Sequence, residues 1–288
     1  MFENVVIVGA TGQLGVAVSR ELERRGQRPI ALAPHQLDLT DERAGEQLVQ
    51  MAPSAVINAA AWTDVRAAEL PENREAVWQI NTHGAAMLAS AAASLKVPFV
   101  HVSTDFVFDG QSDRPYLEQD AVAPLQAYGA SKLDGEVAVR ECCPEAIIAR
   151  TSTVYGDRPE GPPHYVDAIL AQARQRPRIE VVRLPLSSPS YTPDLAAGIL
   201  KLLEVGAQGL VHLVNAGSAS RMELAREAVR LAGYKCEVAE RAAPADDLQR
   251  PDYSVLDGAR YAALAGQPMR DWDVALADYI ETLGRGAK

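Results

Sequence analysis

The stretch Asn4-Val5-Val6-Ile7-Val8-Gly9-Ala10-Thr11-Gly12-Gln13-Leu14-Gly15 joins a short apolar run to three glycines spaced three residues apart. The β-branched run is typical of a strand that is buried on both faces. A helical pattern follows, with Leu14, Val18 and Leu22 on its apolar side. A strand that enters a helix through such a turn presents close backbone and free N–H groups to an anion, so the stretch predicts a pyrophosphate-binding loop. A tight turn that binds no ligand is the alternative.

The composition narrows the class of protein. The chain has 288 residues, a hydrophobic content of 48% and a formal net charge of −10. An acidic chain is a poor partner for nucleic acid or an anionic membrane surface, and no apolar run reaches the roughly 18 residues of a membrane span. The three cysteines have neither disulfide-framework nor zinc spacing, which indicates a reducing compartment and no metal site. Because the start shows no signal peptide, the expected location is the cytoplasm.

Apolar runs and helical patterns alternate along the chain. Further strands are expected at residues 29–32, 54–58, 97–102, 146–150 and 209–214. This order predicts an α/β protein with a Rossmann-type, doubly wound parallel sheet and a small C-terminal substrate lobe. We assign residues 1–155 and parts of 191–215 to a dinucleotide-binding domain. Residues 156–190 and 216–288 are expected to form the interleaved substrate-binding lobe.

The segment after the second strand bears on the cofactor. A carboxylate about 20 residues past the loop usually binds the ribose of NAD, but Ala33-Pro34-His35 contains no acid. The cofactor is therefore expected to be NADPH or NADH, with a slight preference for NADPH. The next residues, Asp38-Leu39-Thr40-Asp41, are expected to cap a helix that runs to about Met51.

Small and polar residues occupy the carboxyl ends of two expected strands. Ala59-Ala60-Ala61 follows the third strand and leaves room for a flat ring or a ribose, whereas Ser103-Thr104-Asp105 follows the fourth and supplies hydroxyl groups. Turn or cap roles are the alternative for Ser103 and Thr104. A long helix is expected from about Pro71 to Ser94. Within it, Asn81 is either partly solvated or holds backbone near the site.

Tyr128-Gly129-Ala130-Ser131-Lys132 places a phenol and an ammonium four residues apart, on one face of a helix. A phenol titrates near pH ~10, and a neighbouring positive charge favours the phenolate. Tyr128 beside Lys132 is therefore expected to have a lowered pKa and to exchange a proton with a hydroxyl or carbonyl oxygen. A half-buried tyrosine beside a solvated lysine is the alternative.

Together these motifs resemble the extended short-chain dehydrogenase/reductases, and most closely their dTDP-4-dehydrorhamnose reductase branch. The resemblance rests on the Gly9–Gly15 loop, Asn58-Ala59-Ala60-Ala61, residues 103–110 and the Tyr128–Lys132 segment. It implies that Tyr128 is the general acid, that Lys132 binds the nicotinamide ribose and tunes Tyr128, and that Thr104 orients the carbonyl. The implied cofactor-binding residues are Gly9, Thr11, Gly12, Gln13, Leu14, Gly15, Asp38, Leu39, Ala59, Ala60, Ala61, Ser103, Tyr128 and Lys132. The implied substrate-binding residues are Thr104, Asp105, Val107, Phe108 and Thr153.

The second half departs from the family pattern at two places. Thr153 stands where the family usually has a Trp that packs on the sugar, and residues 184–190 lack the family's polar Asp-Gln-x-Gly-x-Pro-Thr pattern. Both departures point to a changed ligand. Residues 156–164, which contain three prolines, are expected to form a loop over the site. Ser220 is expected to cap one helix of the lobe, and residues 271–283 to form the last helix.

The resemblance leaves three functions open. The first is an NAD(P)H-dependent ketoreductase of the 4-keto group of a nucleotide-activated 6-deoxysugar. The second is a reductase of the same fold with another carbonyl substrate. The third is a non-catalytic NADP-binding subunit like the regulatory subunit of methionine adenosyltransferase. The expected partner is a small molecule, with a homodimer as one option for the oligomeric state.

Overall fold

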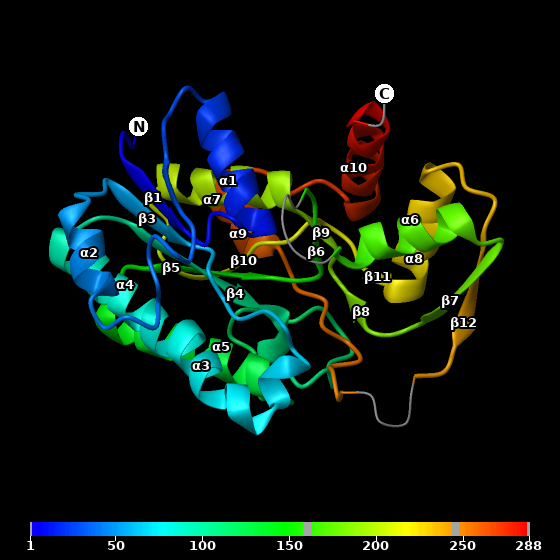
Figure 1. The fold of residues 1–288 in the computed structure, drawn as a ribbon, viewed down its shortest axis with the longest axis horizontal. Helices are drawn as coiled ribbons and strands as arrows, with labels where there is room; N and C mark the ends of the chain where they lie inside the picture. The colour runs from blue at the N-terminus through cyan, green and yellow to red at the C-terminus, as the bar shows by residue number, and fades with distance from the viewer. Residues whose placement is uncertain (1, 158–162, 244–247, 287–288) are drawn as a thin grey trace.

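A single parallel sheet of six strands forms the larger part of the molecule (Figure 1). The computed structural model describes residues 2–157, 163–243 and 248–286. Along the sheet the order is β10-β5-β4-β3-β1-β2, and the neighbouring strands pair in parallel. The strands are β1 (Val5–Val8), β2 (Ile30–Leu32), β3 (Ala55–Asn58), β4 (Phe99–Thr104), β5 (Ile147–Thr151) and β10 (Gly209–His212). The expected Rossmann-type fold is confirmed.

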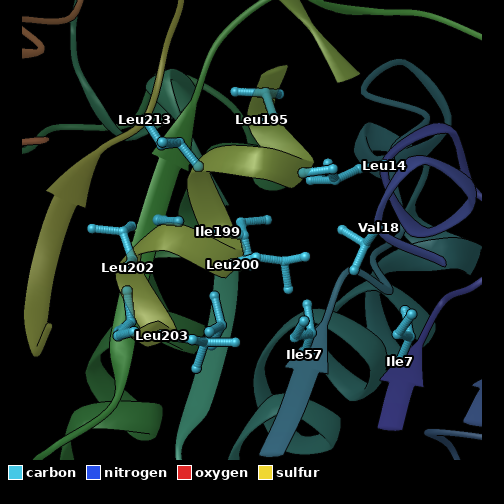
Figure 2. Close-up of a cluster of buried hydrophobic side chains, with 14 of the residues drawn as sticks. Ile7, Leu14, Val18, Ile57, Leu195, Ile199, Leu200, Leu202, Leu203 and Leu213 are labelled. Atoms are coloured by element: carbon cyan, nitrogen blue, oxygen red, sulfur yellow. The ribbon is translucent and has the colours of Figure 1, made fainter. Parts of the chain in front are cut away.

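Helices cover both faces of this sheet, because strand side chains alternate between the two faces. Val5 and Ile7 of β1 pack in one core cluster, whereas Val6 and Val8 pack in the other. Over the first face lie α1 (Gln13–Arg24), α7 (Thr192–Glu204) and α9 (Ala259–Ala265). Figure 2 shows side chains of α1 and α7, among them Val18 and Leu200, packed toward Ile57 of the sheet. Over the second lie α2 (Ala44–Gln50), α4 (Ala85–Leu95) and α5 (Ala127–Cys142).

The smaller lobe contains three helices and short two-stranded sheets. Its helices are α6 (Tyr165–Gln175), α8 (Arg221–Leu231) and α10 (Trp272–Gly286). Its strands pair as β7 (Arg178–Val182) with β12 (Glu237–Arg241) and β8 (Leu186–Ser187) with β11 (Ala219–Ser220). The capping prediction for Ser220 is confirmed, because its hydroxyl accepts from Glu223 N–H in a capping box.

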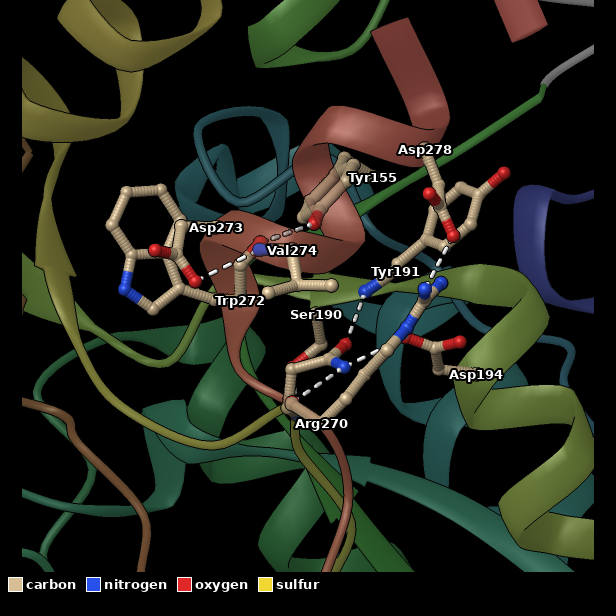
Figure 3. A network of polar contacts seen from close by, with 10 residues as sticks. Tyr155, Ser190, Tyr191, Asp194, Arg270, Trp272, Asp273, Val274 and Asp278 are labelled. Carbon is tan, nitrogen blue, oxygen red and sulfur yellow. Dashed lines mark hydrogen bonds and ion pairs between the residues drawn. The ribbon is translucent and has the colours of Figure 1, made fainter. Parts of the chain in front are cut away.

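A polar network joins α10 of the lobe to α7 of the larger part (Figure 3). Arg270 Nε donates to Asp194 Oδ2 at 2.8 Å, and the same guanidinium contacts Asp278. Asn215 Nδ2 donates to Asp194 Oδ2 at 2.7 Å, and its Oδ1 accepts from Tyr191 N–H at 2.8 Å. Beside this network, β6 (Val154–Tyr155) pairs with β9 (Ser190–Tyr191), so the chain crosses between the two parts here.

Two local predictions were wrong. Asp38 and Asp41 do not cap α2, which begins at Ala44 with no side-chain cap. Asp38 Oδ1 instead accepts from Thr40 N–H, and Asp41 Oδ1 from Arg43 N–H, because short acidic side chains bond to backbone two residues ahead.

The long helix expected from Pro71 is broken into several pieces. A 3₁₀ turn, η2 (Pro71–Asn73), leads into α3 (Arg74–Trp78), and a π-helical segment, η3 (Gln79–Gly84), separates α3 from α4. Single π-helical turns inside helices are frequent at functional sites. Another 3₁₀ turn, η1 (Ala67–Glu69), precedes η2.

The C-terminal residues divide between the two parts. α9 packs on the main core through Tyr261, although residues 216–288 were assigned to the lobe. Of the loop expected at residues 156–164, residues 158–162 lie outside the described residues. In the part of the chain that is described, no helix is long and apolar enough to cross a bilayer.

Candidate active site

The glycine loop lies where the strand order of the sheet reverses. β1 has β2 on one side and β3 on the other, and open α/β sheets bind ligands in the crevice at such a switch point. Gly9 follows β1 with φ +82°, and a Cβ there would lie 2.5 Å from Ala60 N. A Cβ on Gly15 would lie 2.2 Å from Gly9 O. Both positions therefore require glycine for packing alone.

The start of α1 fits an anionic group. Gly12, its N-cap, provides no side-chain cap, and the N–H groups of Gln13 and Leu14 have no partner within the described residues. Gln13 Nε2 is also buried and unpaired there. A Cβ on Gly12 would meet only Gly9 O, at 3.4 Å. Free donors at a helix N-terminus suit a pyrophosphate, so these residues fit a dinucleotide, with Thr11 exposed in the same loop.

The other expected cofactor residues differ in exposure. Ala59, Ala60 and Ala61 follow β3 beside Gly9 and are half-buried. Asp38 is exposed, whereas the side chain of Leu39 packs in the core that α2 and α4 share. A cofactor would therefore contact Leu39 through main-chain atoms.

The end of β4 brings Thr104 and Asp105 together. Thr104 Oγ1 accepts from Phe106 N–H at 3.2 Å, which caps the 3₁₀ turn η4 (Asp105–Val107), and donates to Asp105 Oδ1 at 3.1 Å. Asp105 is only 3% exposed. Its Oδ2 accepts from Ser152 Oγ at 2.7 Å and Ser254 Oγ at 2.5 Å. Burial raises the pKa of Asp105 to about 6, although these hydroxyl groups oppose the rise.

Several side chains predicted to contact a ligand face the protein instead. Both carboxylate oxygens of Asp105 are bonded to hydroxyl groups, and Ser103 Oγ donates to Glu136 at 2.6 Å. Val107 and Phe108 are fully buried, and Phe108 stacks on the Tyr116 ring at 4.0 Å. An apolar cluster and a polar network enclose the segment that follows β4, and ligand contacts of these four residues stay predictions.

Helix α5 positions Tyr128 and Lys132 in its first two turns. Its approach to η4 is close, since a Cβ on Gly129 would lie 2.2 Å from Phe106 O. The Tyr128 ring meets Phe106 edge-on at 6.0 Å and borders an apolar cluster, and the Thr104 side chain is near enough to lower the pKa of the Tyr128 phenol. The expected pair of Thr104 and Tyr128 is thus brought together.

The expectation that Lys132 lowers the pKa of Tyr128 was wrong for this structure. Burial raises the pKa of Tyr128 to about 12; the hydrogen bond with Thr104 lowers it, and the Asp105 charge raises it further. Lys132 makes no resolved contribution, because its Nζ points to Val102 O, at 2.7 Å, and to His101 Nε2, at 3.2 Å. Burial lowers the pKa of Lys132 to about 8, against the attraction of Glu136.

Asn81 holds backbone near the site, which was one of its two sequence-based alternatives. It is 1% exposed and lies in η3. Its Oδ1 accepts from Trp62 N–H at 2.8 Å, and its Nδ2 donates to Ser131 Oγ at 2.9 Å. The loop after β3 is thereby fixed to α5 between Tyr128 and Lys132.

Thr153 begins the turn after β5, with φ +42°. It is half-buried, and its Oγ1 hydrogen-bonds to Ser187 Oγ at 2.7 Å. A β-branched residue in the left-handed region is an outlier that marks strain or function. Among the expected substrate residues, Thr153 is half-buried, whereas Thr104, Asp105, Val107 and Phe108 are buried.

Sequence reasoning missed His101 and the role of Asn58. Both are fully buried polar residues, on neighbouring strands, at positions that register opposite each other. A polar residue between Val100 and Val102 was the available signal, because buried strands rarely carry a polar side chain without a partner.

Two surface cavities lie away from this crevice. One, of about 830 Å³, lies between α7, α9 and α10, and the other, of about 600 Å³, between α1, α7 and α10. None of Thr104, Tyr128 and Lys132 lines either cavity. Within the described residues, no group of three or more His, Cys, Asp or Glu side chains could hold a metal ion.

Comparison with known proteins extends over nearly the whole chain. A dTDP-4-dehydrorhamnose reductase of Mycobacterium tuberculosis is 37% identical, covering 96% of this chain and 91% of that protein. A dTDP-4-keto-6-deoxy-D-glucose reductase of Streptomyces niveus is 34% identical, covering 98% of each. The crystal structure of dTDP-4-dehydrorhamnose reductase from Bacillus anthracis in complex with NADP is 32% identical, with a TM-score of 0.91, and covers 98% of this chain and 100% of that one. Because the model of the RmlD substrate binding domain family matches residues 3–285, the chain belongs to that family.

Proposed function

We propose that the protein is an NAD(P)H-dependent ketoreductase that reduces the 4-keto group of a nucleotide-activated 6-deoxysugar. The observation that carries the proposal is the close approach of Tyr128, at the start of α5, to the turn that follows Thr104 at the carboxyl edge of β4, where the Tyr128 ring meets Phe106 at 6.0 Å. The two hydroxyl groups lie on the edge of the sheet that also carries the Gly9–Gly15 loop. An acid, an orienting hydroxyl and a dinucleotide cradle on one edge are what a carbonyl reduction requires.

Tyr128 acts as the general acid in this proposal. Its pKa of about 12 keeps the phenol protonated at neutral pH, which is the form that can donate to a carbonyl oxygen. The alkoxide that develops during reduction is a stronger base than the phenolate, so the proton transfer runs toward the substrate. Thr104 supports it, because the Thr104 side chain lowers the pKa of the phenol against the effect of burial.

The loop residues Gly9, Thr11, Gly12, Gln13, Leu14 and Gly15 would hold the pyrophosphate, and Ala59, Ala60 and Ala61 would border the ribose. A bound NAD(P)H supplies the hydride for the carbonyl carbon. The absence of an acid in Ala33-Pro34-His35 leaves the 2′-phosphate of NADPH unopposed, and the Bacillus anthracis relative is described in complex with NADP.

The sugar is proposed from the relatives' names. Those of Mycobacterium tuberculosis and Streptomyces niveus are named for dTDP-4-dehydrorhamnose and dTDP-4-keto-6-deoxy-D-glucose. Both compounds carry a 4-keto group on a 6-deoxysugar. Thr153, which is half-buried after β5 and pairs with the buried Ser187, would contact the sugar.

The test is an assay of the pure protein with NADPH or NADH and a panel of dTDP-4-keto-6-deoxysugars, followed by the absorbance of the reduced nicotinamide. We expect turnover with at least one sugar, and none in Tyr128→Phe above about 1% of the parent rate. Binding of NADPH without turnover of any sugar would instead favour a non-catalytic subunit. Turnover of an unrelated ketone alone would contradict the proposed substrate.

The compartment and the oligomeric state are the two remaining parts of the proposal. The free cysteines Cys142, Cys143 and Cys236 suit the cytoplasm, where thiols stay reduced, and fractionation tests this placement. A homodimer stays a prediction, which sedimentation velocity tests.

A further inference from the structure

A row of three buried side chains runs under the crevice from β3 to α5. Asn58 Nδ2 lies 3.2 Å from His101 Nδ1, and His101 Nε2 lies 3.2 Å from Lys132 Nζ. Asn58 and His101 are register partners on adjacent strands, so their side chains project from the same face of the sheet. All three residues are at most 2% exposed. Water therefore cannot compensate a mismatch of donors and acceptors among them.

The orientation of Asn58 is fixed by a backbone group. The Ala60 N–H can only donate, and it lies 3.1 Å from Asn58 Oδ1. The amide nitrogen of Asn58 must therefore face His101, and an amide nitrogen can only donate. His101 Nδ1 consequently accepts, and carries no proton.

The remaining nitrogen of His101 then decides the state of Lys132. Burial, and secondly the Lys132 charge, lower the pKa of His101 well below its ordinary value, so the ring is neutral. A neutral imidazole with an unprotonated Nδ1 carries its hydrogen on Nε2, which faces Lys132 Nζ. An ammonium has no lone pair to accept that N–H, whereas a neutral amine has one. Val102 O accepts from Nζ in either state.

The charged groups around Lys132 do not remove this mismatch, in which the His101 Nε2–H and the Lys132 ammonium are both donors. Glu136, one turn further along α5, attracts the ammonium. It is itself engaged by Arg150, at 2.7 and 2.8 Å, and by Ser103. Asp105, from the turn after β4, acts on Tyr128. Burial outweighs Glu136, so the pKa of Lys132 falls to about 8.

We propose that His101 is a positioning residue that sets the protonation state of Lys132: its Nε2–H stabilises the neutral amine against the ammonium. The consequence for turnover rests on the proposed reductase function. The tautomer of His101 then decides at which pH Lys132 gains or loses its charge.

The first experiment reads the resting state by NMR, without substrate or turnover. The chain has five histidines and five lysines, so ¹⁵N-labelled imidazoles and ¹³C-labelled lysine side chains give resolvable signals, with Lys132→Met for assignment. We expect His101 to be a neutral Nε2–H tautomer from about pH 6 to 9, and Lys132 to titrate near 8. The other lysines should titrate near ~10.4. An Nδ1–H tautomer, or a Lys132 that titrates with the other lysines, overturns the proposal.

The second experiment releases the tautomer. In Asn58→Leu nothing forces Nδ1 to accept, so Nε2 can accept from the ammonium, and the Lys132 midpoint should rise by about one unit or more. The matched control is Asn215→Leu, which removes another fully buried asparagine, at the junction with the lobe, and should leave the midpoint unchanged. A midpoint that stays in place in Asn58→Leu contradicts the proposal.

Should Asn58→Leu fail to fold, Asn58→Asp keeps the shape of the side chain. Its second carboxylate oxygen accepts from an Nδ1–H, so the tautomer should invert and the Lys132 midpoint should rise. An added charge alone would raise the midpoint but leave the Nε2–H tautomer in place, which would count against the proposal.

The pH dependence of turnover connects the two states. We expect the basic limb of kcat/KM near pH 8 in the parent, moving up together with the Lys132 midpoint in the Asn58 variants. The position of the limb is the readout, because Asn58 adjoins Ala59–Ala61 and its loss also lowers the rate. If the basic limb of kcat/KM stays in place while the titration midpoint of Lys132 shifts, turnover does not depend on the charge of Lys132, and that part of the inference is overturned. Failure of the whole sugar panel, with the NMR results intact, overturns the proposed function instead.

Discussion

The larger part, built on the six-stranded sheet, and the smaller lobe place their buried polar groups differently. In the larger part these groups form connected rows beneath one crevice, as in Asn58, His101 and Lys132. In the lobe they secure turns and junctions, as the capping box of Ser220 and the Arg270 network do. Under the proposed function, the proton chemistry belongs to the larger part, and the lobe supplies shape and hydroxyl contacts.

The two parts meet at Asp105, where hydroxyl groups of Ser152 and Ser254 reach the turn that follows β4. Ser254 belongs to the segment that returns from the lobe, so the lobe is bonded to the residue next to Thr104. Variants on either side of Asp105 can therefore separate a loss of catalytic rate from a loss of stability.

The largest effect is expected from Tyr128→Phe, which removes the acid but keeps the ring against Phe106. Positioned acid–base groups contribute about 10²- to 10⁴-fold, so kcat should fall by that factor while cofactor affinity stays within about twofold. Single-turnover rates measure it. The matched control in the lobe is Tyr165→Phe, whose hydroxyl donates to Arg221 O, and it should keep full turnover. A Tyr128→Phe variant that is as fast as the parent would place the chemistry elsewhere.

The same contrast explains what the sequence could predict. The expected strands at residues 54–58 and 146–150 correspond closely to β3 and β5, because strands buried on both faces carry continuous apolar runs. The lobe strands β6, β8, β9 and β11 have two residues each. Such short strands depend on partners far along the chain and have no local periodicity.

The site was predictable where a motif is local, as in the glycine loop and the Tyr128–Lys132 spacing. It was not predictable where burial decides the chemistry. The sequence places Lys132 one turn from Tyr128, but not against His101 and Val102 O, 30 residues away in β4. The pKa of Tyr128 was therefore expected to fall, although burial raises it.

Asp105→Asn tests the joint between the two parts through pH. The pKa of Asp105 is about 6 in the folded protein and 3.8 for an ordinary aspartate, so the folded state binds more protons between these values. Its contribution to stability is full below about pH 4 and is lost as the pH rises through about 6, roughly 3 kcal/mol in all. Asp105→Asn should remove this fall, which thermal unfolding from pH 4 to 7 measures.

The control is Asp109→Asn, where the sign reverses. Backbone and Tyr116 hydrogen bonds lower the pKa of Asp109, so its contribution is present above its ordinary pKa and lost as the pH falls. If the stability of Asp105→Asn and that of the parent changed in parallel with pH, burial would not raise the pKa of Asp105.

Gly12→Val tests whether the glycine loop binds a phosphate. A Cβ at residue 12 meets only Gly9 O, at 3.4 Å, so the fold should tolerate the side chain while the space beside α1 is filled. We expect cofactor affinity to weaken at least tenfold, or about 1.4 kcal/mol, in titration calorimetry. Gly258→Ala, where a Cβ meets no atom within 4 Å, is the control. If a folded Gly12→Val variant bound NADPH and NADH as tightly as the parent does, the loop would not be the pyrophosphate site.

The smallest effect on stability is expected at Thr153, where two contributions oppose each other. Thr153→Gly relieves a left-handed backbone that costs a non-glycine residue about 1–2 kcal/mol, but it loses the hydrogen bond to Ser187, worth about 1 kcal/mol. The free energy of unfolding should therefore change by less than about 1 kcal/mol. Ser187→Ala keeps the strained backbone and loses only the bond, so it should be the less stable of the two variants. If Thr153 faces the sugar, both variants should raise KM for the nucleotide sugar and leave KM for NADPH unchanged, because the glycine loop follows β1, which β3 and β4 separate from β5 in the sheet. If both KM values changed equally, residues 153 and 187 would support the cofactor site as well as the sugar site. The assignment of separate roles to the two parts would then be wrong.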